Sequence, residues 1–135
     1  MSDVADRLRL LVVNRAGNRC EYCRLSQEGQ EASFHIDHIT PRAWGGSTEP
    51  DNLALACVSC SLRKSARRSA LDPLTGRKVS LFHPRRQSWS RRFRWEGMTI
   101  IGSTPTGRAT VHVLDMNRPL ILAIRLEESL RGRLT

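Results

Sequence analysis

Two cysteine pairs of identical spacing constrain this chain more than any other feature. Cys20 and Cys23 are separated by two residues, and Cys57 and Cys60 repeat this spacing further along the chain. A Cys-x2-Cys knuckle directs two thiolates at one ion, and two knuckles complete a closed tetrahedron. A closed four-sulfur site leaves no position open for water. The spacing therefore predicts one structural zinc ion bound by Cys20, Cys23, Cys57 and Cys60.

The length of 135 residues allows one domain, and an apolar fraction of 39% makes its core modest. We expect zinc to supplement this core, because zinc binding contributes roughly 10 to 16 kcal/mol in small zinc peptides. The N-terminal segment MSDVADRLRLLVVN contains only the short apolar run LLVV, which is neither a signal peptide nor a membrane span. We therefore expect a cytoplasmic protein with reduced thiols and no membrane partner.

The net charge of +9 is concentrated in one segment. Residues 61–95 contain 11 Lys or Arg residues and a single acid, Asp72. A solvated basic face, or the arginine bias of a GC-rich genome, is an alternative explanation, but a genomic bias for arginine over lysine does not explain why acids are missing from this segment. We expect a polyanionic partner, DNA with RNA as the other possibility. The candidate nucleic-acid-binding residues are Arg63, Lys64, Arg67, Arg68, Arg85, Arg86, Arg91 and Arg92.

Periodicity and helix breakers divide the chain into short elements. Residues 4–16 have helical spacing before Gly17, and residues 33–39 alternate as a strand before Pro41. Residues 52–56 are either a second strand or an approach to the next knuckle. Further helices are predicted over 61–70, over 105–116 and from Pro119, with a turn over 71–76 and a strand over 78–83. The helix over 61–70 is expected to carry Arg63, Lys64, Arg67 and Arg68.

Three aromatic residues of the basic segment, Trp89, Phe93 and Trp95, have near-helical spacing. We interpret them as a small core that packs the C-terminal segment, rather than as a platform for stacked bases. His83 lies in the same segment, and we interpret it as a phosphate contact or a packing residue rather than a catalytic one.

The segment between the cysteine pairs contains Asp37, His38 and Asn52. Histidine can act as a base near neutral pH, a carboxylate is a hard ligand for a divalent cation, and an amide can orient a histidine. Strand alternation places Asp37 and His38 on opposite faces, so one site can use both only where the strand bends or ends. A metal ion that joins the two pairs clamps this segment at its ends, which favours a rigidly held site.

The joint pattern CEYC…FHIDHITPRAWGG…DNLALACVSCSLRK, over about residues 20–64, resembles the HNH endonuclease family. The resemblance implies a ββα-metal core stabilised by the four-cysteine zinc site. It implies that His38 is the general base that activates water and that Asp37 ligates a catalytic Mg2+ or Mn2+ ion. It also implies that Asn52 holds the His38 loop in position.

The family usually supplies its second metal ligand from an Asn or His directly after the last cysteine, and here this residue is Ser61. Three outcomes are open: Ser61 is a weak ligand and activity is reduced, another group such as His35 substitutes, or the site has decayed. His35 lies two residues before Asp37 and so on the same strand face. We interpret His35 as a cross-strand packing residue.

The sequence therefore predicts an α+β protein with an HNH-type ββα-metal core, a structural four-cysteine zinc, an N-terminal helix and a helical C-terminal appendage. The core spans residues 1–70, and the basic appendage, residues 71–135, packs on the same domain. The predicted function is metal-dependent hydrolysis of phosphodiester bonds in DNA, with low or nicking-type specificity. The alternatives are a catalytically weakened or inactive zinc-stabilised nucleic-acid-binding module and a nuclease that acts on RNA.

Overall fold

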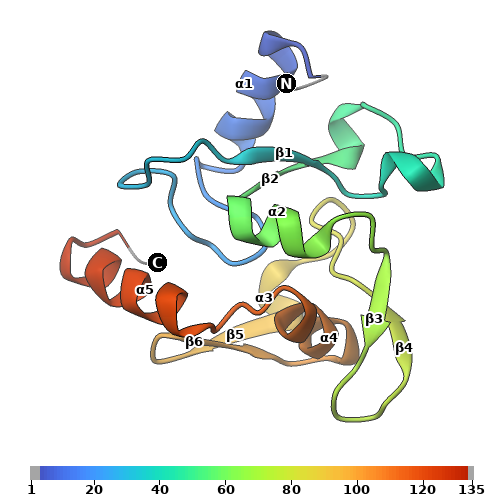
Figure 1. Cartoon of the computed structure of the whole chain (residues 1–135). Coiled ribbons are helices and arrows are strands. Elements are labelled where there is room, and N and C mark those ends of the chain that lie inside the picture. The colour runs from blue at the N-terminus through green and yellow to red at the C-terminus, as the bar shows by residue number, and fades with distance from the viewer. Residues whose placement is uncertain (1–3, 134–135) are drawn as a thin grey trace.

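The computed structural model describes residues 4–133, which form short helices and three two-stranded antiparallel sheets (Figure 1). The elements in chain order are α1 (Asp6–Arg15), β1 (His35–His38), η1 (Arg42–Trp44), η2 (Pro50–Asn52), β2 (Leu53–Ala56), α2 (Val58–Lys64), β3 (Ser69–Leu71), β4 (Lys78–Ser80), α3 (Trp89–Arg92), β5 (Phe93–Glu96), β6 (Thr99–Gly102), α4 (Pro105–Val113) and α5 (Pro119–Leu130). This mixture confirms the predicted α+β class. None of the described helices is long and apolar enough to cross a membrane.

The sheet of β1 and β2 carries Asp37 and His38 and lies between α1 and α2 (Figure 1). Asp37 pairs with Ala54 and His38 with Leu53 in an antiparallel register. All four residues of β2 are buried, because α1 contacts this strand and α2 contacts both strands. The succession of β1, β2 and α2 is the ββα arrangement that the resemblance implied.

Helix α2 is shorter than the sequence predicted. Arg67 and Arg68 were expected on this helix, but it ends at Lys64, and Ser65 adopts a positive φ of 49°. The buried Lys64 side chain anchors the last helical turn, and the chain then enters β3, which pairs with β4. These tertiary contacts outweigh the helix propensity of residues 66–70.

The aromatic residues of the C-terminal segment pack together without sharing a helix. Helix α3 includes Trp89 but ends before Phe93, where β5 begins and pairs with β6. The Trp89 ring lies 5.0 Å from the Phe93 ring and 5.9 Å from the Trp95 ring, measured between centroids. The packing interpretation is therefore confirmed. The appendage contains the predicted helices α4 and α5 and also the β5–β6 hairpin, which the sequence did not predict.

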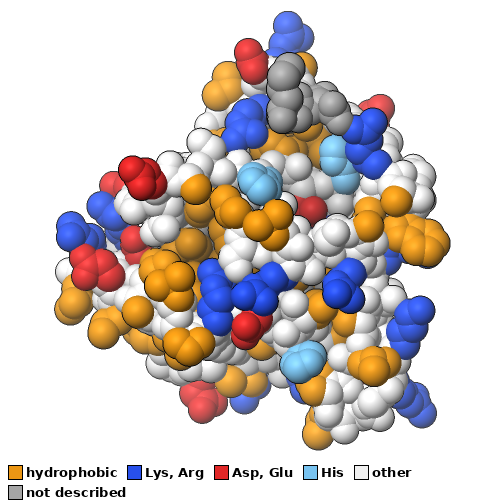
Figure 2. Space-filling view, viewed as in Figure 1, with side chains coloured by type: hydrophobic (Ala, Val, Ile, Leu, Met, Phe, Trp, Pro, Cys, Tyr) orange, Lys and Arg blue, Asp and Glu red, His pale blue; other side chains and the backbone are white. Residues whose placement is uncertain are grey.

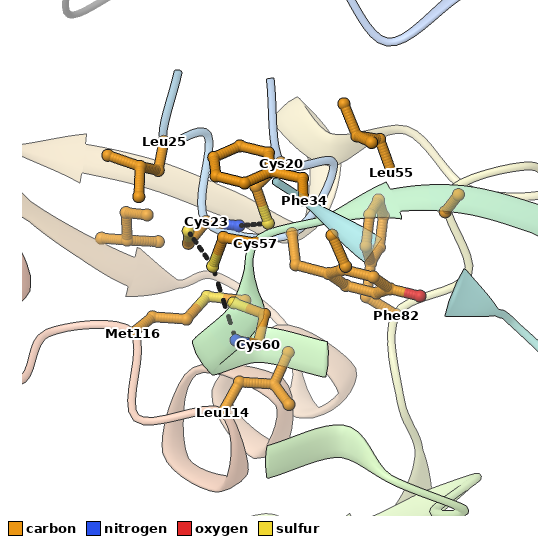
Figure 3. Packing of buried hydrophobic residues seen from close by; sticks show 14 of the residues in the cluster. Cys20, Cys23, Leu25, Phe34, Leu55, Cys57, Cys60, Phe82, Leu114 and Met116 are labelled. Carbon is orange, nitrogen blue, oxygen red and sulfur yellow. Dashed lines mark hydrogen bonds between the residues drawn. The ribbon is translucent and has the colours of Figure 1, made fainter. Parts of the chain in front are cut away.

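One hydrophobic core joins the two halves of the chain. Figure 3 shows the four cysteines packed among Phe34 from the first half and Phe82, Leu114 and Met116 from the second. The halves are also linked by an ion pair between Arg85 and Glu21. Because the metal-binding cysteines and the C-terminal aromatic residues share this core, the appendage supports the site rather than standing apart from it.

The β3–β4 hairpin is held to α4 by one buried acid. Arg108 of α4 donates two hydrogen bonds of 2.9 Å to the Asp72 carboxylate. These bonds hold the pKa of Asp72 well below its usual range. Asp72, the only acid of the basic segment, is therefore paired inside the fold, whereas Arg77 and Lys78 of the hairpin are exposed.

Candidate active site and metal centre

The four cysteines converge on one point inside the core (Figure 3). Their sulfur atoms all lie within 4.8 Å of one another, and Cys23 Sγ lies 3.7 Å from Cys57 Sγ. A disulfide requires about 2.05 Å, whereas a tetrahedron with metal–sulfur bonds of about 2.3 Å has edges of about 3.8 Å. In each knuckle the second cysteine's N–H group donates to the first cysteine's sulfur at 3.4 Å. The cluster is arranged to hold a metal ion, as the spacing predicted.

Asp37 faces α2 and is almost fully buried, with 8% of its surface exposed. Its Oδ2 atom accepts a hydrogen bond of 2.7 Å from the Tyr22 hydroxyl and lies 3.2 Å from Lys64 Nζ. The Lys64 ammonium also donates to the carbonyl oxygens of His38 and Ile39, both at 3.0 Å. The prediction that Lys64 binds nucleic acid is therefore corrected, because its buried ammonium group is already bound by these oxygens.

The electrostatic setting of this carboxylate follows from its burial. Burial raises the pKa of Asp37, while the positive charge of Lys64 and the hydrogen bond from Tyr22 oppose the rise. Burial and the neighbouring Asp37 raise the pKa of Tyr22 well above its ordinary value, so the phenol stays protonated and donates. Asp37 thus depends on one cation and one neutral donor for its stability in the core.

His38 is the last residue of β1, so the strand ends where the sequence required it to end or bend. Its Nε2 atom lies 2.9 Å from the Thr48 hydroxyl oxygen, on the loop between η1 and η2. Asp37 and His38 are therefore consecutive residues with different partners. Asp37 contacts Lys64 of α2, and His38 contacts Thr48 of this loop. The contact between Thr48 and His38 has no local signal in the sequence, and sequence reasoning missed it.

Asn52 joins the end of β1 to the loop that precedes η2. Its Oδ1 atom accepts from the Thr40 N–H group at 2.8 Å, and its amide nitrogen donates to Thr40 O at 3.1 Å and Ser47 O at 2.8 Å. The same loop needs glycine at position 46, because a Cβ atom on Gly46 would lie 1.7 Å from Thr40 O. The loop is therefore held tightly beside the end of β1.

His35 contacts the residue that departs from the family pattern. His35 Nδ1 lies 2.8 Å from Ser61 Oγ, and Ser61 lies three residues before Lys64 on α2. The interpretation of His35 as a cross-strand packing residue is corrected, because its polar contact is with the helix. The face of β1 toward α2 thus carries two neighbouring polar pairs, His35 with Ser61 and Asp37 with Lys64.

The HNH endonuclease family model matches residues 20–67 of this chain. Residues 20–67 form an HNH domain. The match begins at the first cysteine of the metal site and includes β1, β2 and α2. No curated protein and no solved structure matches the chain. The C-terminal residues beyond 67 lie outside the HNH domain, although they share its core.

Asp37, Ser61 and His35 are the side chains of the HNH domain that could hold a second, catalytic cation. Within residues 4–133, only the four cysteines form a converging group of three or more His, Cys, Asp or Glu side chains. A catalytic ion would thus find no complete cage, which suits Mg2+, an ion that keeps several waters and binds one or two carboxylates together with substrate phosphates. A carboxylate has about four acceptor positions, so Asp37 retains capacity, and the Ser61 hydroxyl and the His35 imidazole lie on the same face. These residues fit one Mg2+ or Mn2+ ion.

The predicted nucleic-acid-binding arginines are divided by the fold. Arg85 is partly buried and paired with Glu21, and Arg63 Nη1 lies 3.8 Å from a carboxylate oxygen of Asp115. The others lie either in a groove beside the β3–β4 hairpin, which Arg67, Arg68 and Arg86 line, or on α3, which carries Arg91 and Arg92. Figure 2 shows histidine side chains at the surface over β1, with a row of Lys and Arg side chains between α2 and α4.

Replacing Lys64 with methionine is expected to lower the free energy of unfolding by about 3–5 kcal/mol, because it leaves the buried Asp37 carboxylate without its cation. Urea denaturation of zinc-loaded protein, followed by far-UV circular dichroism, measures the change. Lys78→Met is the matched control, since Lys78 is the other lysine of the chain and is exposed on β4. The control is expected to change stability by no more than about 0.5 kcal/mol. Equal effects of the two changes would show that the buried ion pair contributes nothing.

Proposed function

We propose that this protein is a metal-dependent endonuclease that hydrolyses phosphodiester bonds in DNA with low or nicking-type sequence specificity. The HNH family match supports nuclease activity in general. The observation that carries the proposal is the placement of His38, which contacts Thr48 at the end of β1 and directly follows the buried Asp37 in the sequence. Both residues lie on a segment whose ends are fixed by metal-binding cysteines, so a base and an anionic ligand are kept in one geometry.

In the proposed mechanism His38 takes a proton from the water that attacks phosphorus. The Thr48 hydroxyl orients the imidazole through Nε2, and Asn52 holds the loop that carries Thr48. Asp37, helped by Ser61 or His35, would hold a divalent ion, which supplies positive charge to the phosphate and to the leaving oxygen. General-base catalysis of this kind contributes about 10²–10⁴-fold in rate.

A zinc ion at the four cysteines would have a structural role in this proposal. All four thiols are buried, and a closed set of four sulfur ligands leaves no coordination position for water or substrate. The zinc would fix the relative positions of β1 and α2, because Cys57 and Cys60 belong to the start of α2 while Cys23 lies on the segment leading to β1. The catalytic and structural cations are thus expected to be different ions with different affinities.

One specific observation favours a second candidate, a nucleic-acid-binding module whose catalysis has lapsed. Ser61 stands where the family usually has Asn or His, and its hydroxyl is engaged by His35. Lys64 already neutralises Asp37, the anionic ligand of the proposed ion. A weak neutral ligand and an occupied carboxylate would both reduce cation affinity, so the two candidates differ in whether a divalent ion still binds well enough for cleavage.

A plasmid-nicking assay tests the proposal. Zinc-loaded protein is incubated with supercoiled plasmid, single-stranded DNA or RNA, with Mg2+, with Mn2+ or with neither. Chelators are avoided, because they would also strip the cysteine site. Wild type is expected to nick the plasmid only when Mg2+ or Mn2+ is added. Ser61→Asn is expected to raise the rate at limiting Mg2+ by on the order of tenfold, because contacts around a metal ion commonly change affinity by 10–100-fold.

Ser61→Ala is the matched control, because it removes the hydroxyl without adding an amide oxygen, and it is expected to nick more slowly than wild type. An intact plasmid with wild type under every metal, together with nicking by Ser61→Asn, would establish the binding-module candidate. Cleavage of RNA with the plasmid left intact would replace DNA by RNA as the substrate. Zinc content and melting temperature are measured for each variant to show that differences in cleavage do not come from unfolding.

A further inference from the structure

A basic groove lies beside the end of β1, largely outside the HNH domain. It has a volume of about 580 Å3 and runs between Thr40, the turn after α2, the β3–β4 hairpin and residues 81–87. The name basic groove refers here to its surface-facing basic residues, Arg67, Arg68, Lys78, His83 and Arg86. Among the described residues, no Asp or Glu lines it. Figure 2 shows basic side chains over this hairpin.

The charges of the basic groove are not neutralised within the fold. The acids that pair with other arginines, such as Glu21 and Asp115, lie elsewhere, and within residues 4–133 no ion pair involves the arginines or the lysine of the groove. His83 adds hydrogen-bonding capacity rather than charge, since burial and the neighbouring Arg86 lower its pKa. Four uncompensated cations around one concave surface concentrate positive potential, so the expected occupant is an anion.

The basic groove leads toward the proposed catalytic residue. A second hollow of about 360 Å3 shares Thr40, His83 and Arg86 with it and extends to Ser47. Asp51 and Arg85 also line this hollow, so it is less positive than the basic groove. Ser47 is the neighbour of the threonine that holds His38. The two hollows therefore form a path along the surface from the β3–β4 hairpin to the His38 loop, which suits a chain of several phosphates better than a single small anion.

An exposed aromatic side chain stands at the edge of the basic groove. Trp44 of η1 is 56% exposed, yet two contacts fix its indole. Its Nε1–H group donates to Ala66 O at 3.0 Å, and the Arg68 guanidinium carbon lies 4.1 Å from the ring centroid. A fixed, exposed aromatic ring beside unpaired arginines is the arrangement on which single-stranded nucleic acids stack their bases while cations follow the backbone.

We propose that the basic groove binds the phosphate backbone of a single-stranded segment of nucleic acid, one base of which stacks on Trp44. The bound strand continues toward His38, and in this respect the inference rests on the proposed function. Stacking on a ring requires an unpaired base but does not distinguish one base from another. We therefore expect the protein to recognise an unpaired or frayed region of nucleic acid rather than a particular base sequence.

Fluorescence anisotropy with a labelled 20-nucleotide single strand tests this inference, with zinc-loaded protein and no other divalent cation, so that cleavage does not enter the measurement. The groove variant is Arg67→Gln/Arg68→Gln/Arg86→Gln. The matched control, Arg7→Gln/Arg94→Gln/Arg131→Gln, removes the same charge from exposed positions outside the groove. The groove variant is expected to bind at least tenfold more weakly. Its plot of log K against log salt is expected to be shallower by about 2, because each phosphate contact to a single strand contributes about 0.7.

Trp44→Leu is expected to weaken binding of the single strand about tenfold, with Trp44→Phe retaining most of the affinity, because stacking needs a ring. A duplex of the same sequence is expected to bind wild type more weakly than the single strand. Equal losses of affinity in the two triple variants would overturn the proposal that the groove is the binding site, since they would show that net charge alone attracts the strand. Tighter duplex binding, or full affinity in Trp44→Leu, would overturn the single-strand preference.

The result is separable from the proposed function. If the groove variant loses binding and wild type does not cleave, the groove proposal stands and the endonuclease proposal is wrong. If wild type nicks the plasmid in a metal-dependent way and the groove variant binds as tightly as the control variant, the endonuclease proposal stands and the groove proposal is wrong.

Discussion

Removing the metal ion from the four-cysteine site is expected to unfold the protein. The four buried thiols lie at the centre of the core that joins both halves of the chain. Structural zinc in small peptides binds with about 10–16 kcal/mol, which equals or exceeds the total stability of about 5–15 kcal/mol typical of a domain. Loss of the ion would also leave four thiols facing one another without a ligand. Titration with a high-affinity chelator, followed by far-UV circular dichroism and elemental analysis, measures this effect.

The ellipticity is expected to fall in proportion to the zinc removed and to recover when zinc is restored. Cys20→Ser and Cys57→Ser test the two knuckles separately, and both are expected to yield protein with little zinc and no cooperative melting transition. Withdrawal of Mg2+ alone is the control for ionic effects, and it is expected to leave the melting temperature unchanged. A native melting transition at a zinc content near zero would show that the fold does not depend on a metal ion at the four cysteines.

The features predicted correctly are those that short stretches of sequence encode. The Cys-x2-Cys knuckles depend on spacing alone, and α4 depends on Thr104, whose hydroxyl accepts from the Gly107 N–H group at 3.1 Å at the helix start. Pro119 begins α5 for a similarly local reason, because proline is tolerated in the first helical turn. The ββα order of the HNH domain was predicted from the family resemblance, because the apolar run before Cys57 was compatible either with a strand or with an approach to the next knuckle.

The features missed depend on residues that are distant in sequence. Glu21 neutralises Arg85 across 64 positions, and Lys64 reaches Asp37 across 27 positions, so neither contact has a local pattern. The buried Lys64 also explains why α2 ends early. Composition correctly marked residues 61–95 as basic, but it does not show which of these charges are paired with acids or buried in the folded protein.

The contacts around Asp37 bear on how the proposed site would work. A lysine paired with the only anionic ligand lowers the affinity of a divalent ion, but it also holds that carboxylate and the backbone of His38 in place. The His35–Ser61 contact lies on the same face and keeps further donors close. Substrate phosphate would add the negative charge that the site lacks, since Mg2+ sites commonly complete their ligands with substrate oxygens. Binding of cation and nucleic acid is therefore expected to be mutually dependent.

His38→Ala is expected to lower the rate of plasmid nicking by about 10²–10⁴-fold, because the base that takes the proton from water is lost. Binding to the labelled single strand is expected to stay within threefold of wild type, since His38 does not line the basic groove. Nicking rates at saturating Mg2+, measured from pH 5 to pH 9, separate loss of a base from loss of substrate. The rise of rate with pH that a histidine base produces is expected in wild type and absent from the variant.

His112→Ala is the matched control, because His112 is an exposed histidine on α4, and its nicking rate is expected to equal that of wild type. Thr48→Val retains His38 but removes the hydroxyl bound to Nε2, and it is expected to lower the rate by a smaller factor, about tenfold, while keeping the pH profile. Such a graded result would separate the catalytic residue from the residue that positions it. Nicking that survives unchanged in His38→Ala, with zinc content and melting temperature preserved, would exclude His38 as the base and require another residue to activate water.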